Sequence, residues 1–544
     1  MSRYRFARSP LIACLLAGFV AIALTGCGRR ETPVERGIRE QVLYRGIGPE
    51  VGELDPQLAT GLTEYTILSA LLEGLVAEDP VTLEPVPGVA ERWDISPDAL
   101  QYTFHLRENA RWSNGDPVTA QDFVNSFHRI LTPSLGAQSA TMLYVLQNAE
   151  SFHKGNLDDF SKVGAQALGP RTLRLTLSHP VAHFLSMLNH TAFFPVHLPS
   201  IEKHGPAYAR NNTWARPGTF VGNGPFDLFE WKTGQRIVVK KSATYWDAPT
   251  VRLNAIHFIP SESREVEERA FRAGQLHLTE SLSPSKIDAY RRDHPEMLRI
   301  DPFFGTEFYR INVTLPFLND RRVRRALALA LDREVIVKNV LRGGQEPARA
   351  FTHPGIGGYV SAAWIPTDPE AARALLAEAG YPAGKGAPII ELLYNTSESH
   401  RAVAEAAQEM WRRELGLDVR LVNQEWKVIQ ANRASGGFQL LRSAWNPDYL
   451  DPLSFLSIWT SSSRNNFTGW SSNDYDELLF RAERTVDPAA RNKLLQQAEA
   501  QLLDAAPFIP IYHYAHVFLL HPSVKGWHST PLDHHPYKHV YLEN

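Results

Sequence analysis

Cysteine is almost absent from this chain, which has only Cys14 and Cys27 among its 544 residues. If the mature chain begins at Cys27, it keeps no pair of thiols for a disulfide and too few for a thiolate metal site. Its stability must then come from a hydrophobic core. With 44% hydrophobic residues, the chain can build a large core, spread over about three domains or one two-lobed body.

Familiar catalytic motifs are also missing. The sequence has no G-x-S-x-G nucleophile elbow, no H-E-x-x-H zinc motif and no Walker loop. Gly46, Gly48 and Gly52 have a GxGxxxG spacing, but no helix is expected to open behind them, so we interpret this stretch as a loop and not as a phosphate cradle. We therefore expect a binding protein without a cofactor, and not an enzyme.

A basic tract is missing as well. The formal net charge is −3, and removal of residues 1–26, which contain Arg3, Arg5 and Arg8 but no acid, makes the chain more acidic still. This balance argues against nucleic acid as a partner.

The first 27 residues have the composition of a targeting segment. Arginines precede an apolar run, Leu11–Leu24, that is too short to span a bilayer, and small residues follow it. Residues 1–26 are therefore predicted to be an export signal. Leu24-Thr-Gly-Cys27 resembles the lipobox of bacterial lipoproteins, which implies cleavage before Cys27 and its acylation, although an ordinary secretory signal with a chance cysteine stays open. A flexible polar tether, residues 29–39, is expected to follow.

The most distinctive candidate for binding is the stretch from Leu441 to Pro452. It carries the rings of Trp445 and Tyr449 around one carboxylate, Asp448. Aromatic faces beside a carboxylate suit a cation such as a peptide's ammonium. The alternative is that Asp448 is a turn residue that caps local amides.

Three cationic or titratable residues near this stretch are candidates for the other end of such a ligand. Arg433, Arg442 and His400 can each bind a carboxylate. A peptide has both an ammonium and a carboxylate, so the set indicates a peptide receptor.

Local signals elsewhere predict an α/β body. Alternation predicts a strand at Gln101–Arg107, and Thr119 to Asp122 has the form of a capping box that opens a helix. A hairpin is predicted from Phe226–Trp231 and Arg236–Lys240.

A βαβ unit is predicted from a strand at Pro388–Leu393, a helix at Ser399–Glu414 and a strand at Asp418–Val422. Ligands bind at the carboxyl ends of such parallel strands. His400 follows the first strand and Trp426 follows the second, so both are expected on the ligand side.

Several motifs together resemble one known family. They are residues 85–93, 102–107, 112–123, 223–226, 317–324, 375–381, 392–397 and 422–426. On these motifs the sequence is similar to the family 5 extracellular solute-binding proteins, the peptide and nickel receptors of ABC importers, and most of all to the oligopeptide-binding members. The resemblance covers essentially the whole mature chain.

The resemblance implies an α/β, two-lobed, periplasmic-binding-protein-like fold of class II, cluster C type, with an extra inserted subdomain. The implied divisions are lobe I at 28–72, 197–304 and 514–544, the inserted subdomain at 73–196, and lobe II at 305–513.

The resemblance also implies roles for single residues. Asp448, in Trp445-Asn-Pro-Asp-Tyr449, matches the aspartate that binds the peptide ammonium, while Arg442, Arg433 and His400 match residues that receive the carboxylate. The remaining expected ligand-binding residues are Trp445, Asn446, Trp426 and the extended segment Thr60, Gly61 and Leu62.

Some positions depart from the family pattern. Gly305 and Asn446 stand where close relatives carry a disulfide, which fits a missing bridge. Thr60 and Arg310 stand where relatives have acids. The added positive charge predicts fewer cationic side chains, and more acidic ones, among preferred peptides.

The function implied is that of a lipid-anchored receptor that captures extended oligopeptides between its lobes and delivers them to the permease of an ABC importer. A murein peptide, nickel or another small solute stays open as the ligand. The protein is expected to be a monomer on the periplasmic side of the cell envelope, held to a membrane through Cys27. Seven histidines after residue 512 are expected on the surface, with no metal site.

Overall fold

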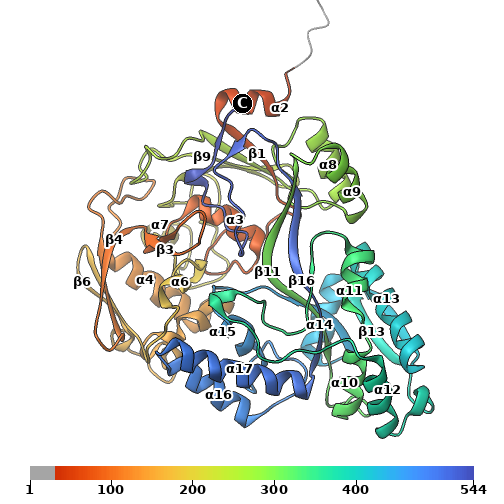
Figure 1. Cartoon of the computed structure of the whole chain (residues 1–544). Helices are drawn as coiled ribbons and strands as arrows, with labels where there is room; N and C mark the ends of the chain where they lie inside the picture. The colour runs from red at the N-terminus through yellow and green to blue at the C-terminus, as the bar shows by residue number, and fades with distance from the viewer. Residues whose placement is uncertain (1–30) are drawn as a thin grey trace, which may run out of the picture.

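The computed structural model describes residues 31–544, which fold into two lobes (Figure 1). One large hydrophobic core draws its residues from 43–278 and 518–542, and the other lies within 308–512. The expected signal peptide, residues 1–26, and the expected lipidation site Cys27 lie outside the described residues. Within residues 31–544, no helix is both long enough and apolar enough to cross a membrane.

The first lobe contains a four-stranded sheet in the order β1-β10-β9-β8. Its strands are β1 (Val42–Gly46), β10 (Ala255–Ile259), β9 (Arg236–Lys241) and β8 (Phe226–Lys232). β8 and β9 form an antiparallel pair, so the predicted hairpin is confirmed.

A helix precedes this sheet where a flexible tether was expected. Helix α2 (Pro33–Glu40) begins with a capping box, in which Thr32 accepts a hydrogen bond from the Glu35 amide and the Glu35 carboxylate accepts one from the Thr32 amide. The expectation of a tether is therefore wrong for these residues. The Thr-x-x-Glu signal was present in the sequence.

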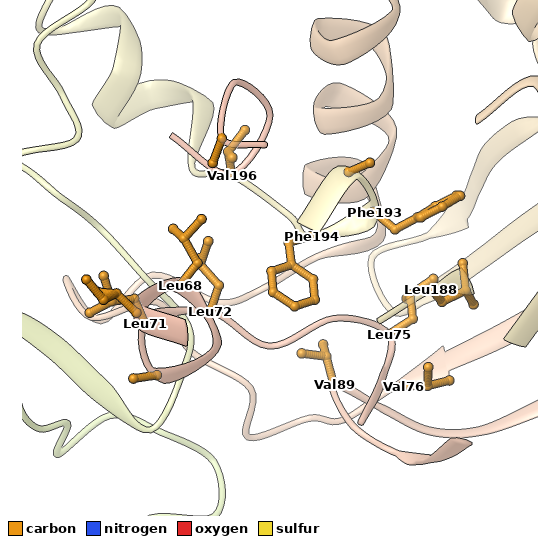
Figure 2. Close-up of a cluster of buried hydrophobic side chains, with 14 of the residues drawn as sticks. Leu68, Leu71, Leu72, Leu75, Val76, Val89, Leu188, Phe193, Phe194 and Val196 are labelled. Atoms are coloured by element: carbon orange, nitrogen blue, oxygen red, sulfur yellow. The ribbon is translucent and has the colours of Figure 1, made fainter. Parts of the chain in front are cut away.

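The inserted subdomain is a second four-stranded sheet, in the order β4-β5-β7-β6. Its strands are β4 (Ala90–Ile95), β5 (Gln101–Leu106), β7 (Thr172–Thr176) and β6 (Ala165–Gly169). Helix α4 (Ala120–Leu131) opens with the predicted capping box of Thr119 and Asp122. Leu68 of α3 (Leu62–Leu71) and Phe194 share one buried cluster, part of which Figure 2 shows, so this subdomain and the first lobe are packed as one body.

The second lobe is organised around a six-stranded mixed sheet in the order β12-β16-β11-β15-β13-β14. The strands are β12 (Glu346–Pro347), β16 (Phe508–Leu519), β11 (Leu298–Ile311), β15 (Leu440–Trp445), β13 (Ile390–Asn395) and β14 (Val419–Gln424). The pair β13 and β14 is parallel and is joined through α13 (Glu398–Leu415), so the predicted βαβ unit is confirmed.

Helices cover both faces of this sheet. Leu440 of β15 belongs to the cluster that contains Trp411 of α13, while its neighbour Leu441 belongs to a separate cluster with Ile429 of α14 (Trp426–Ser435). Because successive residues of a strand point to opposite faces, α13 and α14 lie on opposite sides of the sheet.

Strands β11 and β16 run side by side from one lobe into the other (Figure 1). Their register is interrupted between Pro302 and Thr306. The expected lobe boundaries, at 304/305 and 513/514, both fall inside these strands. The two lobes are thus connected by paired backbone whose register shifts at two points, the second between Glu307 and Phe308.

The expectation that the histidines after residue 512 lie on the surface is wrong for two of the seven, while four others are half-buried. His513 and His535 are buried, and only His528 of the seven is exposed. Asp533 binds both His516 and His535, at 2.9 and 2.8 Å. Burial alone would lower the pKa of His516, but Asp533 raises it to about 9.

Candidate ligand-binding site

The loop that follows β15 is held in place by its backbone and by Trp445. The indole Nε1 of Trp445 donates a hydrogen bond to the Ser454 carbonyl at 2.7 Å, and the Asp448 amide donates to Ser454 Oγ at 2.9 Å. Ser454 lies in the short helix α15 (Leu453–Leu456). The loop is therefore folded back on the helix after it, which fixes the direction of the Trp445 ring.

The carboxylate of Asp448 has no hydrogen bond and no ion pair with any described residue. It keeps exposed surface, yet the protein around it raises its pKa to about 6 through desolvation. The alternative in which Asp448 caps local amides does not hold for the described backbone. An exposed, unpaired carboxylate whose pKa is raised by its surroundings is suited to receive a cation.

The same loop meets the inserted subdomain. The Tyr449 ring stacks on His183, with ring centroids 4.6 Å apart, and the Asp451 carboxylate lies 3.4 Å from His183 Nδ1 and 2.7 Å from Arg491. Burial would raise the pKa of Asp451, but His183 and Arg491 hold it well below its usual range. Asp448 thus sits where the second lobe faces the subdomain of the first.

Arg442 lies on β15 and is already paired. Its Nε donates to Glu307 Oε1 of β11 at 2.6 Å, its Nη2 donates to Glu307 Oε2, and Nη2 also donates to the Tyr514 hydroxyl at 2.7 Å. Burial works against the charge of Arg442, but Glu307 raises its pKa above the ordinary value. Glu307 was not among the residues predicted for the site, because a single carboxylate within a strand gives no local signal of its distant partner.

His400 stands at the start of α13, close to this pair. Burial, followed by the charge of Arg442, lowers the pKa of His400 to about 4, so the imidazole is neutral near pH 7. Its Nδ1 is buried and has no hydrogen-bond partner among the described residues. It can therefore exchange a hydrogen bond with a ligand but cannot offer it a charge.

Helix α14 carries Trp426 and Arg433. They are seven residues apart and so lie on the same face of the helix. Trp426 is 51% exposed, which is unusual for an indole that only fills a core. The Arg433 guanidinium lies 4.8 Å from the centre of the Phe467 ring and makes no ion pair with a described carboxylate.

The segment expected to be extended, Thr60 to Leu62, is extended only in part. Leu62 already begins α3, because Gly61 caps that helix with extended backbone angles. Thr60 and Gly61 are exposed, and no described group bonds the Thr60 amide or carbonyl. The Gly61 carbonyl already accepts a hydrogen bond from the Tyr65 amide at 3.1 Å, so it is the Thr60 amide and carbonyl that are free to pair with a ligand's backbone.

The expected lost disulfide has a matching geometry. A Cβ atom built on Gly305 would lie 2.4 Å from Asn446 Oδ1, so the two positions are neighbours across β11 and the loop after β15. A cysteine pair at these positions would be close enough to bridge.

Metal ligands do not gather elsewhere in the described part of the chain. Within residues 31–544, no group of three or more histidine, cysteine, aspartate or glutamate side chains is placed to hold a metal ion.

Comparison with known proteins identifies the fold. A family model described as bacterial extracellular solute-binding proteins, family 5 middle, matches residues 84–467. The chain is 36% identical to the periplasmic oligopeptide-binding protein OppA of Escherichia coli (strain K12), over 98% of this chain and 97% of that one.

Solved structures agree. The murein tripeptide binding protein MppA of Escherichia coli gives a TM-score of 0.83 at 33% identity, over 92% of this chain and 98% of that one. An MppA structure described as the unliganded open form gives a TM-score of 0.74 at 34% identity, over 92% of this chain and 97% of that one. The two-lobed fold and the resemblance seen in the sequence are confirmed. The chain therefore belongs to the bacterial extracellular solute-binding proteins of family 5.

Proposed function

We propose that the protein binds extended oligopeptides between its lobes and delivers them to the permease of an ABC importer. The observation that carries this proposal is the Asp448 carboxylate, which is unpaired and lies three residues after Trp445, in the loop that meets the inserted subdomain at His183. Relatives over nearly the full chain include OppA, an oligopeptide-binding protein.

In this proposal Asp448 receives the ammonium of the peptide. Trp445 and Trp426 line the space for side chains, and the exposed backbone of Thr60 pairs with the peptide backbone. Asn446, the first residue after β15, offers the ligand its side-chain amide.

The carboxyl end of the peptide meets residues of unequal charge. Glu307 already balances the charge of Arg442, and His400 is neutral. Arg442 and His400 therefore act on the peptide mainly as hydrogen-bond donors and not as sources of net charge. Arg433 has no described carboxylate partner, and it supplies the uncompensated charge that attracts the peptide's terminal carboxylate.

The two lobes close on the peptide by bending about the paired strands β11 and β16. The interrupted register between Pro302 and Thr306 is the position at which these strands can bend. The contacts of His183 with Tyr449 and Asp451 join the subdomain to the second lobe in the closed form.

The role is binding and not catalysis. The signal in residues 1–26 and acylation of Cys27 would hold the protein, as a monomer, to a membrane on the periplasmic side of the cell envelope. Mass spectrometry of the protein recovered from membranes tests this anchor, because acylation at Cys27 adds the mass of lipid to the first mature residue.

A murein peptide is a second candidate ligand. It is favoured by the TM-score of 0.83 to a murein tripeptide binding protein. Calorimetric titration of the purified protein with a tripeptide pool, murein tripeptide and Ni²⁺ separates these ligands. We expect the tripeptide pool to bind and Ni²⁺ not to bind; binding of Ni²⁺ alone would contradict the proposal.

A further inference from the structure

Two arginines lie near one aromatic ring, Phe467. The ring is on the face of the second lobe's six-stranded sheet that α14 covers. The guanidinium carbon of Arg310 lies 5.6 Å from the centre of the Phe467 ring, and that of Arg433 lies 4.8 Å from it. Arg310 comes from β11 and Arg433 from α14, so segments far apart in the sequence bring two cations to one place.

Arg310 is only partly satisfied. The residue as a whole is 1% exposed. Nε donates to Ser443 Oγ at 3.1 Å and Nη1 donates to the Asn466 carbonyl at 2.7 Å, while Nη2 donates to no described group. Nε of Arg433 is likewise buried without a described partner.

Three other buried arginines have a carboxylate partner or full backbone bonding. Arg129 is paired with Asp55 at 2.6 Å, and Arg491 is paired with Asp451 at 2.7 Å. Arg333 has no carboxylate, but each of its three nitrogens donates to a backbone carbonyl. Nε of Arg491 and Nε of Arg45 also lack described partners, so incomplete bonding alone does not distinguish the pair. Arg310 and Arg433 differ because they are two neighbouring guanidinium groups of which neither has a described carboxylate partner.

The pair also lacks a counter-charge. Burial, and then the neighbouring Arg433, lowers the pKa of Arg310 to about 9, so both side chains still carry their charge near pH 7. No described carboxylate forms an ion pair with either. Arg310 is buried and Arg433 is half-buried, so two like charges in these positions are costly, and an anion bonded to both would relieve that cost.

The location connects the pair to the proposed peptide site. Ser443, which accepts from Arg310, lies two residues before Trp445 on β15 and therefore points to the same face of the sheet. Arg433 shares a helix face with the exposed Trp426. The pair thus lies on the side of the sheet that carries both tryptophans.

We propose that Arg310 and Arg433 form an anion-binding subsite that selects peptides with an acidic side chain. This inference rests on the proposed peptide-binding function and adds the class of peptide preferred. Guanidinium groups bind a carboxylate through charge-assisted, often bidentate hydrogen bonds, whereas a neutral amide of the same shape leaves the charges unbalanced.

The test compares Ala-Glu-Ala with the isosteric Ala-Gln-Ala by calorimetric titration of the full-length protein. We expect the glutamate peptide to bind about tenfold more tightly. This ratio should fall toward one in Arg433→Gln and in Arg310→Gln, and should persist in Arg464→Gln, an exposed arginine near the same loop. If Arg310→Gln does not fold, Arg433→Gln decides.

Equal affinity of the two peptides for the wild-type protein would overturn the selectivity while leaving peptide binding intact. A glutamate preference that survives Arg433→Gln would also overturn it. Arg433 is also proposed to attract the terminal carboxylate, so both peptides are tested again after amidation of the carboxyl end. Loss of the ratio on amidation would overturn the side-chain subsite and leave Arg433 with the chain terminus alone. If neither peptide binds, the proposed function itself falls, and this inference falls with it.

Discussion

Glu307 of β11 holds the guanidinium of Arg442 on β15 by two hydrogen bonds, of which the one from Nε measures 2.6 Å. The pair is buried, with 9% of the Arg442 side chain and 2% of the Glu307 side chain exposed. It makes Arg442 a fixed, neutralised part of the site, so the charge available to a ligand lies at Arg433 and Arg310.

Breaking this pair should destabilise the fold. Glu307→Gln leaves the Arg442 charge buried without its partner, so the free energy of unfolding is expected to fall by about 3 kcal/mol. Urea denaturation measures it. The matched control is Glu391→Gln, which removes the partner of the exposed Arg420 and should cost less than about 1 kcal/mol. Equal losses in the two variants would contradict this account of the pair.

Two aspartates of one loop should respond in opposite ways. The pKa of Asp448 is raised, so its ionised form is disfavoured in the folded state, and Asp448→Asn is expected to raise the free energy of unfolding at pH 7. The pKa of Asp451 is lowered by its partners, so Asp451→Asn should lower that free energy by about 3 kcal/mol. Thermal and urea unfolding measure both variants, and a loss of stability in Asp448→Asn would assign it a structural role.

Peptide affinity should depend on pH through Asp448. The carboxyl must be ionised to receive an ammonium, and its pKa in the free protein is raised to about 6. Protonation on going from pH 7 to pH 5 should therefore weaken binding about tenfold. His400 stays neutral across this range because its pKa is about 4. Titrations with peptide at four pH values between 5 and 7 measure how the affinity depends on pH. An unchanged affinity at pH 5 would contradict the role of Asp448.

Stability in alkali should depend on His516. Its folded pKa is raised to about 9, above the unfolded value of 6.5, so its interaction with Asp533 stabilises the fold fully below pH 6.5 and is lost as the pH rises through 9. The difference in unfolding free energy between wild type and His516→Gln should shrink between pH 6.5 and 9. The exposed His528 provides the control, since His528→Gln should show no such trend.

Local patterns in the sequence were sufficient for much of the fold. Alternation and turn residues predicted the hairpin of β8 and β9, and a Thr-x-x-Asp signal predicted the start of α4. The βαβ unit also placed His400 and Trp426 after neighbouring parallel strands, because chain topology alone puts them at one edge of the sheet. These features depend on residues close together in the chain.

The parts that sequence could not predict depend on distant partners. Glu307 lies 135 residues from Arg442, and no local signal pairs β11 with β15. The histidines after residue 512 were expected on the surface, but His513 and His535 are buried, and the half-buried His534 bonds Glu78, which is 456 residues away in the chain. The shared ring of Arg310 and Arg433 has the same origin, since three separate segments supply it.

The proposed function depends most on Asp448, which is expected to receive the ammonium of a bound peptide. Calorimetric titration of Ala-Ala-Ala and N-acetyl-Ala-Ala-Ala against the wild-type protein and against Asp448→Asn tests it most directly. We predict that acetylation weakens binding to the wild type on the order of a hundredfold and changes little in the variant, whose binding of both peptides is weak. Equal affinity of the two peptides for the wild type, or the same loss on acetylation in both proteins, would contradict the account.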